Sequence, residues 1–195
     1  MRTTLAFAAL LLGACATAGI GDTWKDPAFA GPPMKKLLVV GVAGSDHSRR
    51  VFEDGFARAL SAAGSGGAPS YPVMPESGAV PQARILEAIQ KTGADGVMVT
   101  KVLRVRRDVE VRTMHSGPGF YGAGFRGYYG SAYSTSVSDV ATYDVITLET
   151  TVWDIRRDKP VWSGTSEVTA PKSVAAGTEE LAGVLIRKMK ADGVI

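Results

Sequence analysis

Cysteine and histidine are scarce in this chain of 195 residues, which has one cysteine, Cys15, and two histidines, His47 and His115. A single cysteine cannot close a disulfide within the chain, and the two histidines lack the spacing of a zinc motif. The apolar run at residues 5–12 is also much shorter than the roughly 20 residues that cross a bilayer. The sequence therefore predicts no metal site, and this run is too short for a membrane-spanning helix.

Neither sign of charge is in large excess, because the chain has 22 lysines and arginines and 19 acidic residues. The net charge of +3 falls to +2 if Arg2 is removed with a leader, which is too small to indicate a nucleic-acid partner. Two overlapping G-x-G-x-x-G matches occur within residues 117–127. Neither follows a strand and opens a helix, as a dinucleotide-binding turn does, so we expect no nucleotide and no cofactor.

Catalytic patterns are missing as well. No serine lies in a G-x-S-x-G elbow, and solvated strand faces explain the neighbouring carboxylates Asp108 and Glu110. We read His47 as an exposed residue of a first helical turn and His115 as a loop residue. We therefore expect no catalytic residues and no enzyme, with a hydrolase built on unrecognised residues as the remaining alternative.

The N-terminus carries the most informative pattern. Arg2 precedes the apolar run, and residues 12–15 (Leu-Gly-Ala-Cys) look like a bacterial lipobox, in which the cysteine receives acyl chains such as palmitate and becomes the new N-terminus. We interpret residues 1–14 as a lipoprotein signal peptide and Cys15 as the lipidation site. Ala16 favours the periplasmic face of the outer membrane over the inner membrane. The alternative is an ordinary secretory signal whose cysteine is incidental.

Residues 15–35 are rich in Gly, Pro, Ala and Thr and predict a lipidated tether or an extended arm. Residues 36–195 predict one α/β (α+β) domain with a single mixed sheet and about three packed helices. The expected elements in chain order are strand 36–42, helix 45–63, strand 68–74, helix 81–93, a strand from 97, loop 115–138, strands 140–155 and 161–168, and helix 178–190.

Three details of these elements can be checked against a structure. On the first helix, Arg49 and Glu53 fall mostly on the polar face, as a surface pair worth about 0.3 kcal/mol. From Val97 onward the odd positions are mostly apolar, which predicts one apolar face and one wet face along the whole strand. Trp153 and Trp162 flank a turn and could meet across it.

The loop at 115–138 alternates glycine with aromatic residues and lies close to several arginines. Tyrosine and arginine are favoured at protein contacts, so we interpret this region as a surface for an envelope partner or for self-association. Contact with lipid or glycan, and a loop without a partner, are the alternatives. The candidate binding residues are Phe120, Tyr121, Phe125, Arg126, Tyr128, Tyr129, Tyr133, Arg104 and Arg106.

Four segments together carry a resemblance to a known family: residues 23–42, 49–54 (Arg-Arg-Val-Phe-Glu-Asp), 93–97 (Gly-Ala-Asp-Gly-Val) and 161–166 (Val-Trp-Ser-Gly-Thr-Ser). They resemble a family of uncharacterised bacterial envelope lipoproteins with a domain of unknown function. The fold that this implies is similar to the N-terminal domain of the Tol-Pal translocation protein and to the curli-secretion lipoprotein.

The second comparison implies an alternative function, because extensions of the curli-secretion lipoprotein form strands of an outer-membrane pore. The corresponding segment here lacks clean alternation over about 10 residues. We therefore expect a membrane-anchored, non-enzymatic lipoprotein with a binding or scaffold role in the periplasm. A subunit of an export or pore-like oligomer is the alternative.

Overall fold

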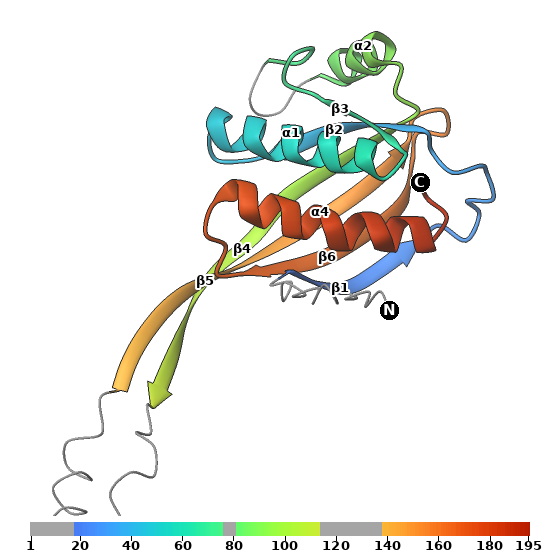
Figure 1. Ribbon diagram of the computed structural model, residues 1–195. Helices are drawn as coiled ribbons and strands as arrows, with labels where there is room; N and C mark the ends of the chain where they lie inside the picture. Colours follow the sequence, from blue (N-terminus) through green and yellow to red (C-terminus); the bar gives the residue numbers. More distant parts are fainter. Residues whose placement is uncertain (1–17, 76–80, 114–137) are drawn as a thin grey trace, which may run out of the picture.

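The computed structural model describes residues 18–75, 81–113 and 138–195, and Figure 1 shows the arrangement of their elements. The elements in chain order are β1 (Ala18–Lys25), β2 (Lys36–Val42), α1 (Asp46–Ala62), β3 (Gly66–Pro69), α2 (Gln82–Thr92), β4 (Gly96–Thr113), β5 (Ser138–Asp154), β6 (Lys159–Thr169) and α4 (Val174–Ala191). The predicted α/β class is confirmed, with one mixed sheet and three described helices.

The six strands form one sheet in the order β1-β6-β5-β4-β2-β3. β2 runs parallel to β3 and β4, whereas the β4–β5, β5–β6 and β6–β1 pairs are antiparallel. The parallel part needs crossover helices, which α1 and α2 supply, and in the antiparallel part β5 and β6 are joined by the short turn at 155–158.

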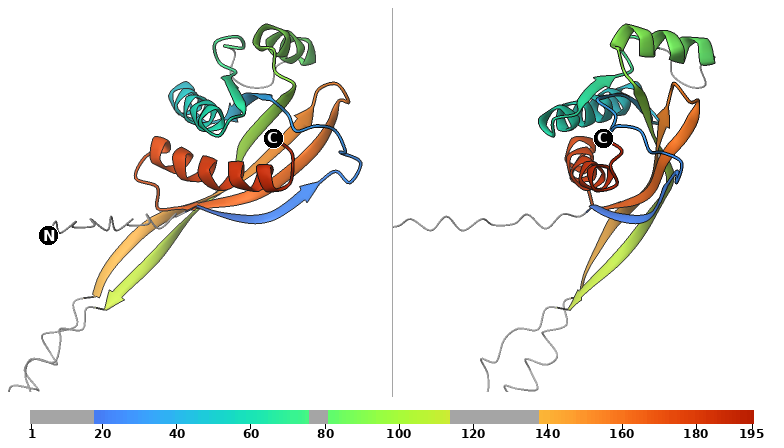
Figure 2. Two further views of the ribbon diagram at one scale, coloured as in Figure 1. Left: turned by 45° about the vertical axis from the view of Figure 1, so that its right-hand side comes forward. Right: turned by 90° about the vertical axis from the view of Figure 1, so that its right-hand side faces the viewer.

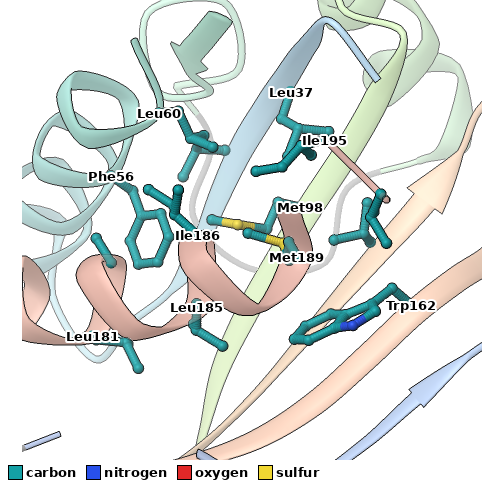
Figure 3. Close-up of a cluster of buried hydrophobic side chains, with 14 of the residues drawn as sticks. Leu37, Phe56, Leu60, Met98, Trp162, Leu181, Leu185, Ile186, Met189 and Ile195 are labelled. Atoms are coloured by element: carbon teal, nitrogen blue, oxygen red, sulfur yellow. The ribbon is translucent and has the colours of Figure 1, made fainter. Parts of the chain in front are cut away.

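Successive residues of β2 face opposite layers of the structure. Leu37 and Val39 belong to the main core with α1 and α4, and Leu38 belongs to a second cluster with Ala88 of α2. Figure 2 shows α1 and α4 on one face of the sheet and α2 toward the other. We call these the α1–α4 face and the α2 face; the close-up in Figure 3 shows the core beneath the former.

β1 occupies chain that we expected to belong to a tether or an extended arm. Ala18 lies opposite Val168 of β6, and Lys25 lies opposite Trp162, so residues 18–25 form an edge strand of the sheet. The ordered sheet thus begins before residue 36, where we placed the start of the domain. Only Ala16 and Thr17 separate Cys15 from this strand.

α1 and α4 begin at residues whose side chains cap them. Ser45 accepts a hydrogen bond from the backbone N–H of Ser48, in agreement with the predicted start of this helix at residue 45. α4 begins earlier than expected, with Ser173 accepting from the N–H of Ala176. Thr178 is therefore inside the helix, where its hydroxyl donates to the carbonyl of Val174, and the predicted start of this helix at residue 178 was wrong.

β4 and β5 continue past the rest of the sheet as a long hairpin, which projects from the body in Figure 1. A bulge interrupts their register, because Val102 lies opposite Leu148 and Arg104 opposite Thr147, leaving Leu103 as the extra residue. The extra residue changes which positions share a face. Within the sheet the even positions of β4 face α1 and α4, and beyond Leu103 the odd positions do.

The prediction of one apolar face along the whole strand was therefore wrong. Val97 packs in the cluster with α2, whereas Val105 lies opposite Ile146, which packs against the main core on the other face. The predicted contact between Trp153 and Trp162 was also wrong. Trp153 lies opposite Pro160, and Trp162 lies opposite Val152 and is fully buried.

Candidate functional site

An apolar groove opens between the N-terminal halves of α1 and α4 and the sheet beneath them. Its volume is 260 Å³, and none of its lining residues carries a charge. The floor comes from β2, β4, β5 and β6 and the walls from the two helices and the turns before them. The lining residues are Gly41, Val42, Ala43, Gly44, Ser48, Phe52, Thr100, Val102, Ile146, Leu148, Val168, Pro171, Ser173, Val174, Gly177, Thr178 and Leu181.

The hydroxyl groups in the walls are already occupied by hydrogen bonds within the protein. Thr100 and Thr150 hydroxyls lie 2.9 Å apart in the floor, and the Thr178 hydroxyl donates to a helix carbonyl at 2.7 Å. The capping Ser173 accepts from a backbone N–H, and Ser48 bonds the Ser45 hydroxyl at 3.0 Å. The groove therefore presents a mainly apolar surface to a bound molecule, and its described lining offers no charged group for acid–base chemistry.

The apolar surface continues from the groove onto the hairpin. Val102, which lines the groove, is 47% exposed, and Val105 and Val109 on the same face are each 59% exposed. Arg107 interrupts this row and pairs with Asp144 across the hairpin at 3.2 Å. A surface of exposed valines on a projecting hairpin is unusual enough to be a candidate contact site.

The two predicted arginines of this region lie on the other side of the hairpin. Arg104 and Arg106 are exposed on the α2 face, and Arg106 pairs with Asp108 of the same face at 3.0 Å. The arginines and the valines therefore lie on opposite faces of the hairpin and do not form one surface. The sequence did not reveal this division because the bulge at Leu103 carries no local signal.

The remaining predicted residues of this region fall outside the described part of the chain. They are Phe120, Tyr121, Phe125, Arg126, Tyr128, Tyr129 and Tyr133, and the same holds for Cys15 and His115. His47 is exposed in the first turn of α1, as expected. Among residues 18–75, 81–113 and 138–195, no group of three His, Cys, Asp or Glu side chains is placed to hold a metal ion.

A buried ion pair lies beside the C-terminal end of β2, where we expected a surface pair. Arg49 Nε lies 2.9 Å from Glu53 Oε1, and the two side chains are 8% and 0% exposed. The Glu53 carboxylate also accepts bonds from the backbone N–H groups of Gly41, Ser70 and Tyr71. With each oxygen engaged, Glu53 holds β2, α1 and the chain after β3 together as a structural group.

Arg49 completes this network from the other side. Its guanidinium donates to the Ser70 hydroxyl at 2.9 Å and to the Met74 carbonyl at 2.8 Å. Nearby, the Tyr71 hydroxyl donates to Asp54 at 3.2 Å, and this hydrogen bond raises the pKa of Tyr71. The prediction of a surface pair was wrong because these partners, distant in sequence, enclose the first turns of α1.

Comparison with known proteins identifies structures of similar arrangement. No family model matches the sequence, and no curated protein does. A PelC variant from Paraburkholderia phytofirmans, described as a dodecamer, is 17% identical, with a TM-score of 0.48 over 86% of this chain and 95% of that chain. A second PelC dodecamer from the same organism is also 17% identical, with a TM-score of 0.45 over 86% and 94%. Lipoprotein GNA1162 from Neisseria meningitidis is 16% identical, with a TM-score of 0.42 over 80% and 98%. Each TM-score is below 0.5, so function is argued from the chain's own residues.

Proposed function

We propose that this protein is a lipid-anchored, non-enzymatic component of the bacterial cell envelope that works at the membrane surface through its β4–β5 hairpin. The observation that carries the proposal is the pairing of Ala18 with Val168. It attaches the candidate anchor, Cys15, to the end of the sheet from which the hairpin projects. Because Ala16 follows Cys15, we expect the anchor to lie in the outer membrane.

The anchor and the folded body are close together in this arrangement. Cys15 precedes Ala18 by three residues, which span about 10 Å when fully extended. The row of paired residues that starts at Ala18 continues through Val168 and Ile146 to Val105 of the hairpin. A bilayer holding the lipid of Cys15 therefore lies within about 10 Å of this row.

The hairpin extends well beyond that row on the same side. The part of β4 from Arg106 to Thr113 spans about 27 Å at about 3.4 Å per residue. A segment of that length, starting so close to a membrane, is long enough to lie along the bilayer or to enter it. Val105 and Val109 on one face and the arginines on the other suit an interface with anionic head groups.

The non-enzymatic part of the proposal rests on the character of the described groups. The carboxylate of the fully buried Glu53 accepts hydrogen bonds that hold the fold together. The described residues that line the groove carry no charge. A helix that could cross a membrane is also not found within the described residues. Membrane attachment in this proposal is through the lipid on Cys15.

Depth-dependent fluorescence quenching tests this function directly. In the mature lipidated protein the thiol of Cys15 is blocked, so a single added cysteine can be labelled. Val109→Cys probes the hairpin, and Leu86→Cys on α2 is the control, the native side chains being 59% and 43% exposed. In vesicles with brominated lipid we expect quenching at position 109 and none at position 86. Equal signals at the two positions, or an intact mass without lipid, would overturn the proposal.

A second candidate, a subunit of an export or pore-like oligomer, is favoured by the exposed valines of the hairpin. Val102, Val105 and Val109 form a row that a neighbouring copy could cover. Light scattering coupled to size exclusion separates the two functions. A stable ring-sized assembly that Val105→Asp dissociates would favour the oligomer, and a monomer would not.

A further inference from the structure

The groove between α1 and α4 has the surface of a site for an apolar ligand. Among its lining residues Val42, Val102 and Val174 are 57%, 47% and 45% exposed, although each adjoins a well-packed core. Apolar surface gathered in a concave site is typical of ligand pockets, because its burial is favourable. A ligand that covers these valines would therefore bind favourably.

The chemistry of the walls limits what that occupant can be. Because the described lining holds no charged residue, and the hydroxyls of Thr100 and Thr178 are bonded within the protein, the groove offers little to hold a charged head group. The volume of 260 Å³ is also below the range of about 300–1,000 Å³ that drug-sized ligands occupy. A single flexible hydrocarbon chain fits both limits better than a whole phospholipid.

One source of such a chain lies next to the groove. Ala18 and Val168 are directly opposite each other in an antiparallel pair, so their side chains share a face, and Val168 lines the groove. Ala18 is itself buried in the main core on that face. The residue that we propose to be lipidated, Cys15, is attached within about 10 Å of this point.

From these relationships we propose that the groove seats one acyl chain of the lipid carried by Cys15 of the same molecule. The inference rests on the proposed lipidation of Cys15 and adds a destination for one of its chains. The seated chain covers Val102 and Val174 and holds the body against the membrane, while the other chains remain in the bilayer. It thereby gives the domain a fixed orientation that a lipid tether alone does not.

Photo-crosslinking in the full-length protein tests the inference. The amino acid p-benzoyl-phenylalanine replaces Val174 at the rim of the groove or, as a matched control, Leu86 on α2, the native residues being 45% and 43% exposed. Cells receive an alkyne-tagged fatty acid, their membranes are illuminated, and the products are separated by size and sequenced by mass spectrometry. A third variant with the probe at Val102 repeats the measurement from the floor, and circular dichroism confirms that each variant is folded.

The expected product is a monomer in which position 174 or 102 is joined to the acyl chain on Cys15, with no such product from position 86. A covalent dimer would mean that the chain comes from a second copy. An adduct with phospholipid would mean that the groove takes membrane lipid. Either of these, equal labelling at position 86, or no adduct at 174 and 102 overturns the inference. An intact mass without lipid refutes the proposed lipidation instead, so the two failures are distinguishable.

Discussion

The indole nitrogen of Trp162 donates a hydrogen bond to the carboxylate of Asp192, 2.8 Å away, and so joins the middle of β6 to the end of α4. Trp162 is fully buried beneath that helix, and Lys188 pairs with the same carboxylate at 2.7 Å. The contact fixes the packing of α4 at the end of the sheet opposite the groove.

Trp162→Phe removes this hydrogen bond and part of the packed volume, so we expect a loss of about 2 kcal/mol in the free energy of unfolding. Urea denaturation followed by far-ultraviolet circular dichroism measures the loss. Trp153→Phe is the matched control, because that side chain is 37% exposed, and it should change stability by less than about 0.5 kcal/mol. Equal losses in the two variants would contradict the assignment.

The pKa of Asp192 gives this contact a pH dependence. Burial pushes the pKa upward, but the hydrogen bonds from Lys188 and Trp162 outweigh burial and leave it below the ordinary 3.8. A lowered pKa means that the carboxylate stabilises the fold above pH 3.8 and that this contribution is lost as the pH falls through the lowered value. Asp192→Asn should therefore be less stable than the wild type at pH 7, and the difference should disappear in acid. A difference that stays constant as the pH falls from 7 to far below 3.8 would contradict the role of charge.

The ion pair between Glu53 and Arg49 should be far more sensitive than its sequence spacing implies. Glu53→Gln removes the buried carboxylate that pairs with the Arg49 guanidinium, so we expect a loss of about 3 kcal/mol in the free energy of unfolding. Glu87→Gln removes an exposed carboxylate that pairs with Lys91 at 2.7 Å, and it should cost less than about 1 kcal/mol. Chemical denaturation of both variants gives the comparison, and similar costs would show that burial is irrelevant.

Close packing of α1 on β3 depends on Gly67. A methyl group there would lie 2.6 Å from the Ala57 Cα and 2.7 Å from its carbonyl oxygen, both backbone atoms that cannot move independently. Gly67→Ala should therefore lower stability by about 1–3 kcal/mol through overpacking. Gly19→Ala in β1 meets no atom within 4 Å and should be neutral. Thermal denaturation measures both, and a neutral Gly67→Ala would show that the helix can shift outward.

Periodicity predicted the order of the elements from residue 36 onward, because apolar runs of strand length and one amphipathic helix are local signals. It missed β1, whose sequence Ala-Gly-Ile-Gly-Asp-Thr-Trp-Lys has too little alternation for a strand and gains order only by pairing with β6. The burial of Arg49 was equally hidden, since its partners Ser70 and Met74 are distant in sequence.

The candidate site was less predictable than the fold. The odd-numbered valines of β4 look like one face in the sequence, but the bulge at Leu103 divides them between two faces. The groove has no sequence motif, because it forms where α1, α4 and four strands meet. The predicted aromatic loop stays a prediction, since it lies outside the described residues.

The pairing of β1 with β6 directly after Cys15 also sets how this protein can meet others. If Cys15 is lipidated as we propose, only Ala16 and Thr17 lie between the bilayer and the sheet, and the domain cannot search the space away from the membrane. Its encounters become two-dimensional: a soluble partner must come to the surface, whereas one anchored in the same leaflet meets it at a high effective concentration. Weak contacts of the hairpin would then suffice among neighbours in the same membrane.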